Sequence, residues 1–214
     1  MRVSSVNIGK LQENPWQDYE HTGIDKSPVQ GPVALHSPSE LGESGVAGDE
    51  LGDKKHHGGH VQAVYSYAAE DYRLFERITG RTFAPGAFGE NLTTEGLDVN
   101  ALVLGQLVRV GPDVVLEASA PRIPCNTFRG YMDTAGWLKT FTAQMKPGAY
   151  FRVIEEGEVR AGDAIEPLEA PAHGYTIAKY FEGRMRDKKI LHDMNAAPGL
   201  PEYVAAYLER KLAS

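Results

Sequence analysis

The sequence predicts a mostly β fold with some α-helix: a strand-rich body followed by a small helical part at the C-terminus. Short apolar runs separated by glycine and proline recur between residues 101 and 118, as in an antiparallel meander or small barrel. Residues 167–173 are rich in proline and alanine, and after them the apolar positions follow a helical period. We therefore expect a β domain over residues 1–166 and a helical subdomain over residues 172–214.

The remaining elements follow from apolar spacing and from turn residues. A helix beginning near Ala68 carries Tyr72, Phe75 and Ile78 at three-residue spacing, and Gly80 is a suitable terminator. Residues 36–52, rich in Ser, Gly and Glu, are expected to form a flexible loop. The predicted strands are 3–8, 22–29, 31–35, 101–104, 106–110, 114–118, 150–154 and 157–163, and the other predicted helices are 134–145, one near 177–181 and one opening at 200–202.

The composition is that of an ordinary globular protein and limits the classes of partner. The 214 residues are 42% hydrophobic and 24% charged, with a formal net charge of -7. This acidic balance argues against binding to nucleic-acid polymers, although a local basic pocket is compatible with it. A single cysteine cannot form an internal disulfide, and we find no signal peptide and no membrane-length apolar run. The expected location is the cytoplasm.

The single cysteine lies in a stiff segment with the sequence PRIPC at residues 121–125. Pro121 and Pro124 fix φ and remove two backbone donors, so the segment is expected to leave a sheet at its rim. Arg122 precedes the thiol by three residues, and a nearby cation favours the thiolate, which is both a nucleophile and a soft metal ligand. The alternative is that Cys125 is a buried, inert side chain.

A histidine group at residues 56–60 offers two interpretations. His56, His57 and His60 could hold zinc, but Gly58 and Gly59 weaken a helix there, and the zinc-protease sequence is incomplete. The paired glycines could instead allow close approach of a ligand, with His57 presenting a hydrogen bond or a proton. A solvated polar turn explains the same residues.

Two further sets of polar residues are candidate ligand contacts. Glu90 and Asn91 could hydrogen-bond a polar ring edge, although a glycine turn with ordinary capping explains their composition equally well. Lys55, Arg122 and Arg152 are candidate cations for an anionic ligand such as a phosphate, the alternative being separate surface charges.

Taken together and in this order, three segments resemble a known family. They are HHGG at residues 56–59, PGAFGENLTTEGL at residues 85–97 and PRIPC at residues 121–125. This combination resembles the MOSC domain, named for the C-terminal domain of molybdenum cofactor sulfurase. The similarity is to its short bacterial members, which are associated with resistance to N-hydroxylated purines. The loop at 36–52 looks enlarged relative to that family.

The resemblance implies a MOSC-type β-barrel that binds a pterin-bound molybdenum cofactor, which could be absent from isolated protein. It implies that Cys125 ligates the metal or carries sulfur, and that His57 lies in the pocket. We expect Cys125 and His57 to be the catalytic residues. The implied cofactor-binding residues, combining this match with the candidate cations, are Lys55, His57, Gly58, Gly59, Glu90, Asn91, Arg122 and Arg152.

Two functions from different classes follow. The first is a molybdenum oxidoreductase that reduces small N-hydroxylated substrates, such as N-hydroxylated bases, to amines. Because no iron–sulfur or dinucleotide motif is present, electrons would come from a separate reductase. The second is a sulfur carrier or cofactor-binding protein that uses a persulfide on Cys125. A purely structural role is a weaker third option, and a homodimer is compatible with the sequence.

Overall fold

The protein is built around one large sheet, as the strand-rich prediction requires. The structure, a computed structural model, describes residues 1–213. Eight strands form the sheet in the order β12-β8-β9-β10-β6-β7-β1-β4, and only the β6–β7 pair is parallel. These strands are β1 (Arg2–Gly9), β4 (Lys26–Pro28), β6 (Val64–Ala68), β7 (Leu92–Glu95), β8 (Leu107–Val110), β9 (Val114–Pro121), β10 (Ala149–Glu155) and β12 (Ile165–Pro167).

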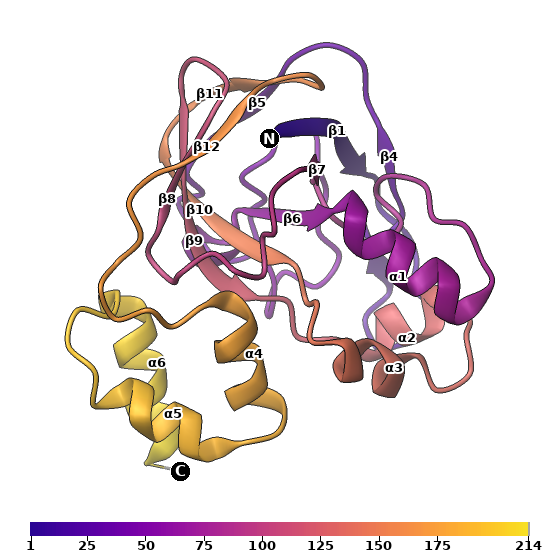
Figure 1. Ribbon diagram of the computed structural model, residues 1–214. Coiled ribbons are helices and arrows are strands. Elements are labelled where there is room, and N and C mark those ends of the chain that lie inside the picture. The colour runs from indigo at the N-terminus through magenta and orange to yellow at the C-terminus, as the bar shows by residue number, and fades with distance from the viewer. Residues whose placement is uncertain (214) are drawn as a thin grey trace.

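Two short strand pairs and six α-helices complete the fold. The pairs are β2 (Gln12–Glu13) with β3 (His21–Thr22), and β5 (Val33–Leu35) with β11 (Gly157–Val159). The helices are the 3₁₀ turn η1 (His60–Gln62), α1 (Ala69–Thr79), α2 (Asn126–Met132), α3 (Trp137–Gln144), α4 (Ile177–Met185), α5 (Lys188–Asn195) and α6 (Glu202–Leu212). Figure 1 shows α4, α5 and α6 gathered at one end of the molecule, away from α1, α2 and α3.

The closed barrel that the resemblance implies is not confirmed. Among residues 1–213 the end strands β12 and β4 do not pair with each other. The sheet nevertheless curves so that β1 approaches β12. An isolated bridge joins Arg2 to Ala164, and the amide of Ile165 donates to the carbonyl of Met1 at 3.0 Å. The observed architecture is therefore a mixed α/β fold around a strongly curved sheet.

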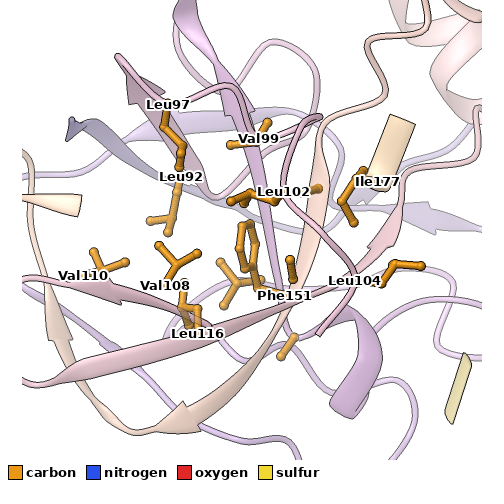
Figure 2. Close-up of a cluster of buried hydrophobic side chains, with 14 of the residues drawn as sticks. Leu92, Leu97, Val99, Leu102, Leu104, Val108, Val110, Leu116, Phe151 and Ile177 are labelled. Atoms are coloured by element: carbon orange, nitrogen blue, oxygen red, sulfur yellow. The ribbon is translucent and has the colours of Figure 1, made fainter. Parts of the chain in front are cut away.

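The main hydrophobic core lies on one face of this sheet and continues into the C-terminal helices. Figure 2 shows Phe151 of β10 surrounded by aliphatic side chains from β7, β8, β9 and the 97–104 segment, with Ile177 of α4 nearby. Burying each such side chain contributes about 1.5–3 kcal/mol relative to leaving it exposed. Because the same cluster includes Met194 and Leu208, the helices pack on the sheet. The division into units at 1–166 and 172–214 stays a prediction.

A second core consists mainly of aromatic rings and lies beneath α1, α2 and α3. Phe88 is fully buried at its centre, and its ring centroid lies 5.4 Å from that of Trp137 and 5.6 Å from that of Phe128. Phe75 of α1 and Phe141 of α3 complete the packing. This cluster fixes the 85–91 segment against α2, and it thereby positions two of the predicted site segments relative to each other.

Several local predictions need correction. Residues 101–104 were predicted as a strand, but they turn and are held by a bridge from Val103 to Thr176, so their apolar character reflects burial against the start of α4. Helix α2 was not predicted, and α3 begins at Trp137 rather than at residue 134. Within 157–163 only Gly157–Val159 is a strand. The α1 helix and its left-handed terminator Gly80 are confirmed.

The 36–52 loop is less free than its composition suggested. Val46 is buried and bridges Leu35, and the amide of Gly45 donates to the carbonyl of Ala63 at 2.8 Å. The loop is therefore packed against the sheet and forms part of a pocket wall. No helix among residues 1–213 has the length and apolar character needed to cross a bilayer.

Candidate functional site

Cys125 lies where the chain leaves the sheet, as the bracketing prolines predicted. Strand β9 ends at Pro121, which pairs with Ala149 of β10. Cys125 is extended, with φ of −117° and ψ of 173°, and it caps the N-terminus of α2. Cys125 is a free cysteine and is partly buried, packed against the aromatic core. The proline segment thus carries the cysteine from the sheet edge to the first turn of a helix without further hydrogen bonding to the sheet.

The cysteine lines a pocket that encloses about 710 Å³, including its mouth. The cavity volume itself is about 100 Å³, which is smaller than the roughly 300–1,000 Å³ typical of sites that bind small molecules. Its walls come from segments distant in sequence: the 19–26 strand and turn, the 44–63 segment, the 88–91 turn and the 122–127 segment, together with Tyr65 of β6 and Tyr150 of β10. The sequence-predicted residues that line it are His57, Gly58, Asn91, Arg122 and Cys125.

Arg122 places a buried positive charge in the wall of this pocket, which bears on the kind of ligand the pocket binds. Its side chain is buried, and Nη1 donates to the carbonyl oxygen of Phe88 at 3.0 Å. The guanidinium carbon lies 3.5 Å from the centroid of the Phe128 ring. Within residues 1–213 it forms neither an ion pair with a carboxylate nor a hydrogen bond to the Cys125 thiol. A buried cation without a counter-charge is costly unless an anion joins it.

The surroundings of His57, whose side chain is 36% exposed, favour the neutral imidazole. Burial lowers the pKa of His57 below its ordinary 6.5, and Asp53 opposes this effect, with 4.0 Å between His57 Nε2 and Asp53 Oδ2. The positive charge of Arg122 acts in the same direction as burial. At neutral pH the imidazole can therefore donate one hydrogen bond and accept one, which suits contact with a ligand.

Gln62 presents the other unusual polar atom of the pocket. Its Oε1 is buried and has no hydrogen-bond partner in the described part of the chain, although it lies near enough to His57 to favour the protonated imidazole. An unpaired buried acceptor costs about 1–3 kcal/mol, so a donor from a ligand or from water would stabilise it. Gln62 was not predicted, and nothing in the sequence around it distinguishes it from a surface glutamine.

A buried ion pair also lines the pocket and was not predicted. Lys26 Nζ donates to Asp49 Oδ1, and the two side chains are 5% and 1% exposed. Asp49 Oδ2 also accepts from Asn91 Nδ2 and from Ser44 Oγ, each at 3.0 Å. Lys26 came from a predicted strand and Asp49 from a loop expected to be flexible. Only the fold brings them together with Asn91.

Glu90 lies outside the pocket and holds one of its walls in place through hydrogen bonds. The carboxylate is fully buried, and it accepts hydrogen bonds from the amide of Gly86 at 2.7 Å, from Thr93 Oγ1 at 2.7 Å and from the Tyr72 hydroxyl. Burial raises the pKa of Glu90. Glu90 does not line the pocket. It fixes the turn that presents Phe88 and Asn91, so its local role is structural.

Three other predicted contacts are not brought to the pocket. Lys55 is exposed, and neither Lys55 nor Gly59 lines the cavity. Arg152 instead pairs with Glu117 at 3.0 Å and lies over the ring of Tyr203 in α6, with 5.0 Å from its guanidinium carbon to the centroid. Arg152 therefore links the sheet to the C-terminal helices.

The glycine pair at 58 and 59 also has a structural reason. A side chain at Gly58, whose φ is 77°, would overlap the carbonyl of Glu43, and the Gly59 amide donates to that same carbonyl at 2.9 Å. Because these glycines have no side chain, the backbone of the 36–52 loop can pack directly against them. Across residues 1–213 no three His, Cys, Asp or Glu side chains are arranged to hold a metal ion, so the geometry does not favour the zinc interpretation of the histidines.

Comparison with known proteins decides the family. The family model described as MOSC domain matches residues 53–166. The chain belongs to the MOSC domain family. The matched region runs from Asp53 beside His57 through Cys125 to the last strand of the sheet, so it includes most of the pocket described above.

Individual relatives agree with this assignment. YflK from Bacillus subtilis (strain 168) is 32% identical over 176 residues, covering 82% of this chain and 76% of that protein. A protein named Reductase from Gibberella moniliformis (strain M3125 / FGSC 7600) is 30% identical over 175 residues, which are 80% of this chain but 30% of the fungal protein. The crystal structure of YiiM from Geobacillus stearothermophilus superposes with a TM-score of 0.76 at 25% identity, covering 99% of this chain and 98% of that one.

Proposed function

We propose that this MOSC protein binds a pterin-bound molybdenum cofactor and reduces N-hydroxylated compounds, such as N-hydroxylated bases, to the corresponding amines. The observation that carries the proposal is the buried Arg122, which pairs with no carboxylate within residues 1–213 and lines the same pocket as the partly exposed Cys125. A soft sulfur ligand beside an uncompensated cation suits a metal cofactor with an anionic group.

The donor set of the pocket fits such a cofactor. Cys125 would hold the metal through its sulfur, while Arg122 would neutralise an anionic group of the pterin. The neutral His57 and the unpaired Oε1 of Gln62 would offer one donor and two acceptors to a heteroaromatic ring edge. When bound, the cofactor supplies the electron-transfer chemistry, and the protein contributes binding and orientation.

The proposed reaction balances as a two-electron reduction. An N-hydroxylated compound, R–NH–OH, takes up two electrons and two protons, the N–O bond breaks, and R–NH₂ and water are released. The electrons would come from a separate reductase protein, since the lone cysteine cannot hold an iron–sulfur cluster. A fungal relative is named Reductase, which agrees with a reductive reaction.

The proposal is tested with protein made in a host that synthesises the cofactor. We expect the wild type to convert 6-N-hydroxylaminopurine to adenine when a low-potential chemical donor supplies electrons. Cys125→Ser should abolish this conversion while its thermal melt, followed by circular dichroism, stays unchanged. A wild type that contains molybdenum and is inert toward hydroxylamines, or a fully active Cys125→Ser, would contradict the proposal.

A sulfur-carrier function is the second candidate, favoured by the free, partly exposed Cys125. In this function a desulfurase persulfide would transfer its outer sulfur to the Cys125 thiolate, giving a Cys125 persulfide and a desulfurase thiolate. Mass spectrometry after incubation with a cysteine desulfurase and cysteine separates the two functions. A gain of one sulfur atom on Cys125 would favour the carrier. An unmodified thiol in a protein that binds molybdenum would favour the reductase.

A further inference from the structure

A short hairpin that lies outside the matched family region forms one wall of the pocket. The hairpin, residues 12–22, consists of β2, β3 and the loop 14–20 between them. Its Tyr19 lines the same pocket as Cys125 and is only half buried, so the ring lies at the margin of the cavity. Burial raises the pKa of Tyr19, and a smaller effect comes from the nearby Cys125.

The hairpin is fastened to the helix that carries the cysteine at its N-terminus. The Tyr19 hydroxyl and Thr127 Oγ1 are 2.8 Å apart, and Asn14 Nδ2 donates to the same Thr127 oxygen at 3.4 Å. Thr127 is buried and lies two residues after Cys125. The ring of Trp16 packs on the backbone of Gly130, where any side chain would overlap it, and its edge meets Tyr131 with centroids 6.1 Å apart.

These contacts give the hairpin a defined position. Strands β2 and β3 pair with each other and not with the large sheet, and the backbone of His21 and Thr22 packs directly on Gly52. The loop between the strands meets α2 through Trp16, Tyr19 and Asn14. The contact of the Tyr19 hydroxyl with Thr127 holds the ring at the margin of the pocket, so losing this contact would allow the ring to move.

We propose that Tyr19 is a specificity-determining residue that limits, by size, which ligands reach the sulfur of Cys125. Thr127 is the positioning residue that holds the Tyr19 ring in the narrow arrangement. The inference rests on the proposed function only in taking this pocket as the ligand site. It concerns the protein without cofactor, so its test is independent of molybdenum binding.

The test measures alkylation of Cys125, the only cysteine in the chain, by two maleimides that differ in bulk. The small reagent is N-methylmaleimide and the bulky one is N-(1-pyrenyl)maleimide, each followed by intact-protein mass spectrometry. The ratio of the two rate constants cancels any change in the intrinsic reactivity of the thiol. Thr127→Val should raise the bulky-to-small ratio by up to about tenfold, the effect expected from losing one neutral hydrogen bond.

Matched variants distinguish the effect of the Tyr19 hydroxyl on access to Cys125 from the effect of the Tyr19 ring. Tyr19→Ala should raise the ratio at least as much as Thr127→Val. Tyr19→Phe should raise it by no more than Thr127→Val, because Thr127→Val removes the contact with Asn14 as well as the one with Tyr19. Arg129→Lys, at an exposed position on α2, should leave the ratio unchanged. An unchanged ratio in Tyr19→Ala, or an equal acceleration of both reagents, would overturn the proposal.

Discussion

The electrostatic state of Arg122 is the residue-level feature on which ligand binding depends. Two arginines were predicted to hold an anion, and the structure separates them: Arg152 is neutralised by Glu117, whereas Arg122 has no described carboxylate partner. We expect Arg122→Ala to weaken cofactor retention by about 1.5–3 kcal/mol, the size of a charge-assisted contact. Pterin and molybdenum retained after dialysis measure this loss.

Arg152→Ala is the matched control for that prediction. It removes the same side chain from a site that meets Glu117 and Tyr203 and does not line the pocket. It should lower thermal stability without changing cofactor retention. Equal retention by both variants would show that Arg122 does not face the anion.

The ionisation of His57 gives the pocket a predicted pH dependence. Because the folded-state pKa lies below the ordinary 6.5, the unfolded chain binds a proton more readily than the folded one. The contribution of His57 to folding stability therefore falls as the pH drops below about 6.5 through the folded pKa. Urea melts of wild type and His57→Gln at several pH values measure it.

The stability difference between wild type and His57→Gln should shift against the wild type as the pH falls through this window. A constant difference across the same pH range would show that burial does not perturb His57 in solution. Comparing the two proteins at each pH removes the contributions of the other titrating groups, because those contributions are common to both.

Residue chemistry was predictable at some site positions and not at others. Cys125 and Arg122 were identified because prolines, a lone thiol and a nearby cation are visible in a single short segment. Glu90 was identified as well, but the sequence could not show that its carboxylate would bind Tyr72 and Thr93 inside the fold. Tyr19, Lys26, Asp49 and Gln62 lie in segments without any local signal, and only tertiary contacts bring them to the pocket.

The elements around the pocket depend on the buried pair of Lys26 and Asp49. Lys26, the first residue of β4, forms an ion pair with Asp49 of the 36–52 loop. Asp49 also accepts hydrogen bonds from Ser44 and Asn91, which hold the loop in place. Removing one partner of a buried pair leaves an uncompensated charge. Lys26→Met should therefore lower the free energy of unfolding by about 3–5 kcal/mol, measured by urea denaturation.

A double-mutant cycle provides the control for this pair. In Lys26→Met with Asp49→Leu neither charge remains, so the loss should be clearly smaller than the sum of the two single losses. Additive losses would mean that the two side chains do not interact in solution.

The predictions of helices and strands were correct where an apolar pattern repeated over many residues. They were wrong where a short buried turn had the apolar composition of a strand. The α1, α4 and α6 helices follow a clear helical spacing, and β9 and β10 follow from β-branched runs. The apolar run at 101–104 is buried against the start of α4 rather than paired in the sheet, and short apolar runs do not distinguish these cases. Helix α2 is too short to show a period.

At the scale of the whole molecule, the helical tail shares a core with the sheet. Ile177, Met194 and Leu208 belong to the same buried cluster as Phe151, and Tyr203 donates to Glu117 at 2.8 Å. We expect a chain ending at residue 171 to expose this surface and to lose solubility and cooperative unfolding. Size-exclusion chromatography and a thermal melt would show it. A truncated chain that melts as cooperatively as the intact protein would support an independent β domain.

The sheet-rich architecture was predicted, and the closure of the sheet was not resolvable from sequence. Whether a sheet closes depends on pairing between strands that are far apart in the sequence. Here the only such contacts described between β1 and the 163–165 segment are one bridge at Arg2 and a few backbone hydrogen bonds. The family could be identified because HHGG, GENLTT and PRIPC stand in a fixed order along the chain. The pocket that unites them required the fold.

The most direct test of the central claim is the metal content of wild-type protein purified from a cofactor-competent host, with molybdenum and zinc measured in the same digest. We predict molybdenum close to equimolar with the protein, together with a releasable pterin, and zinc only at background. Zinc in place of molybdenum, or neither metal in a host whose other molybdoenzymes are loaded, would contradict the proposed function.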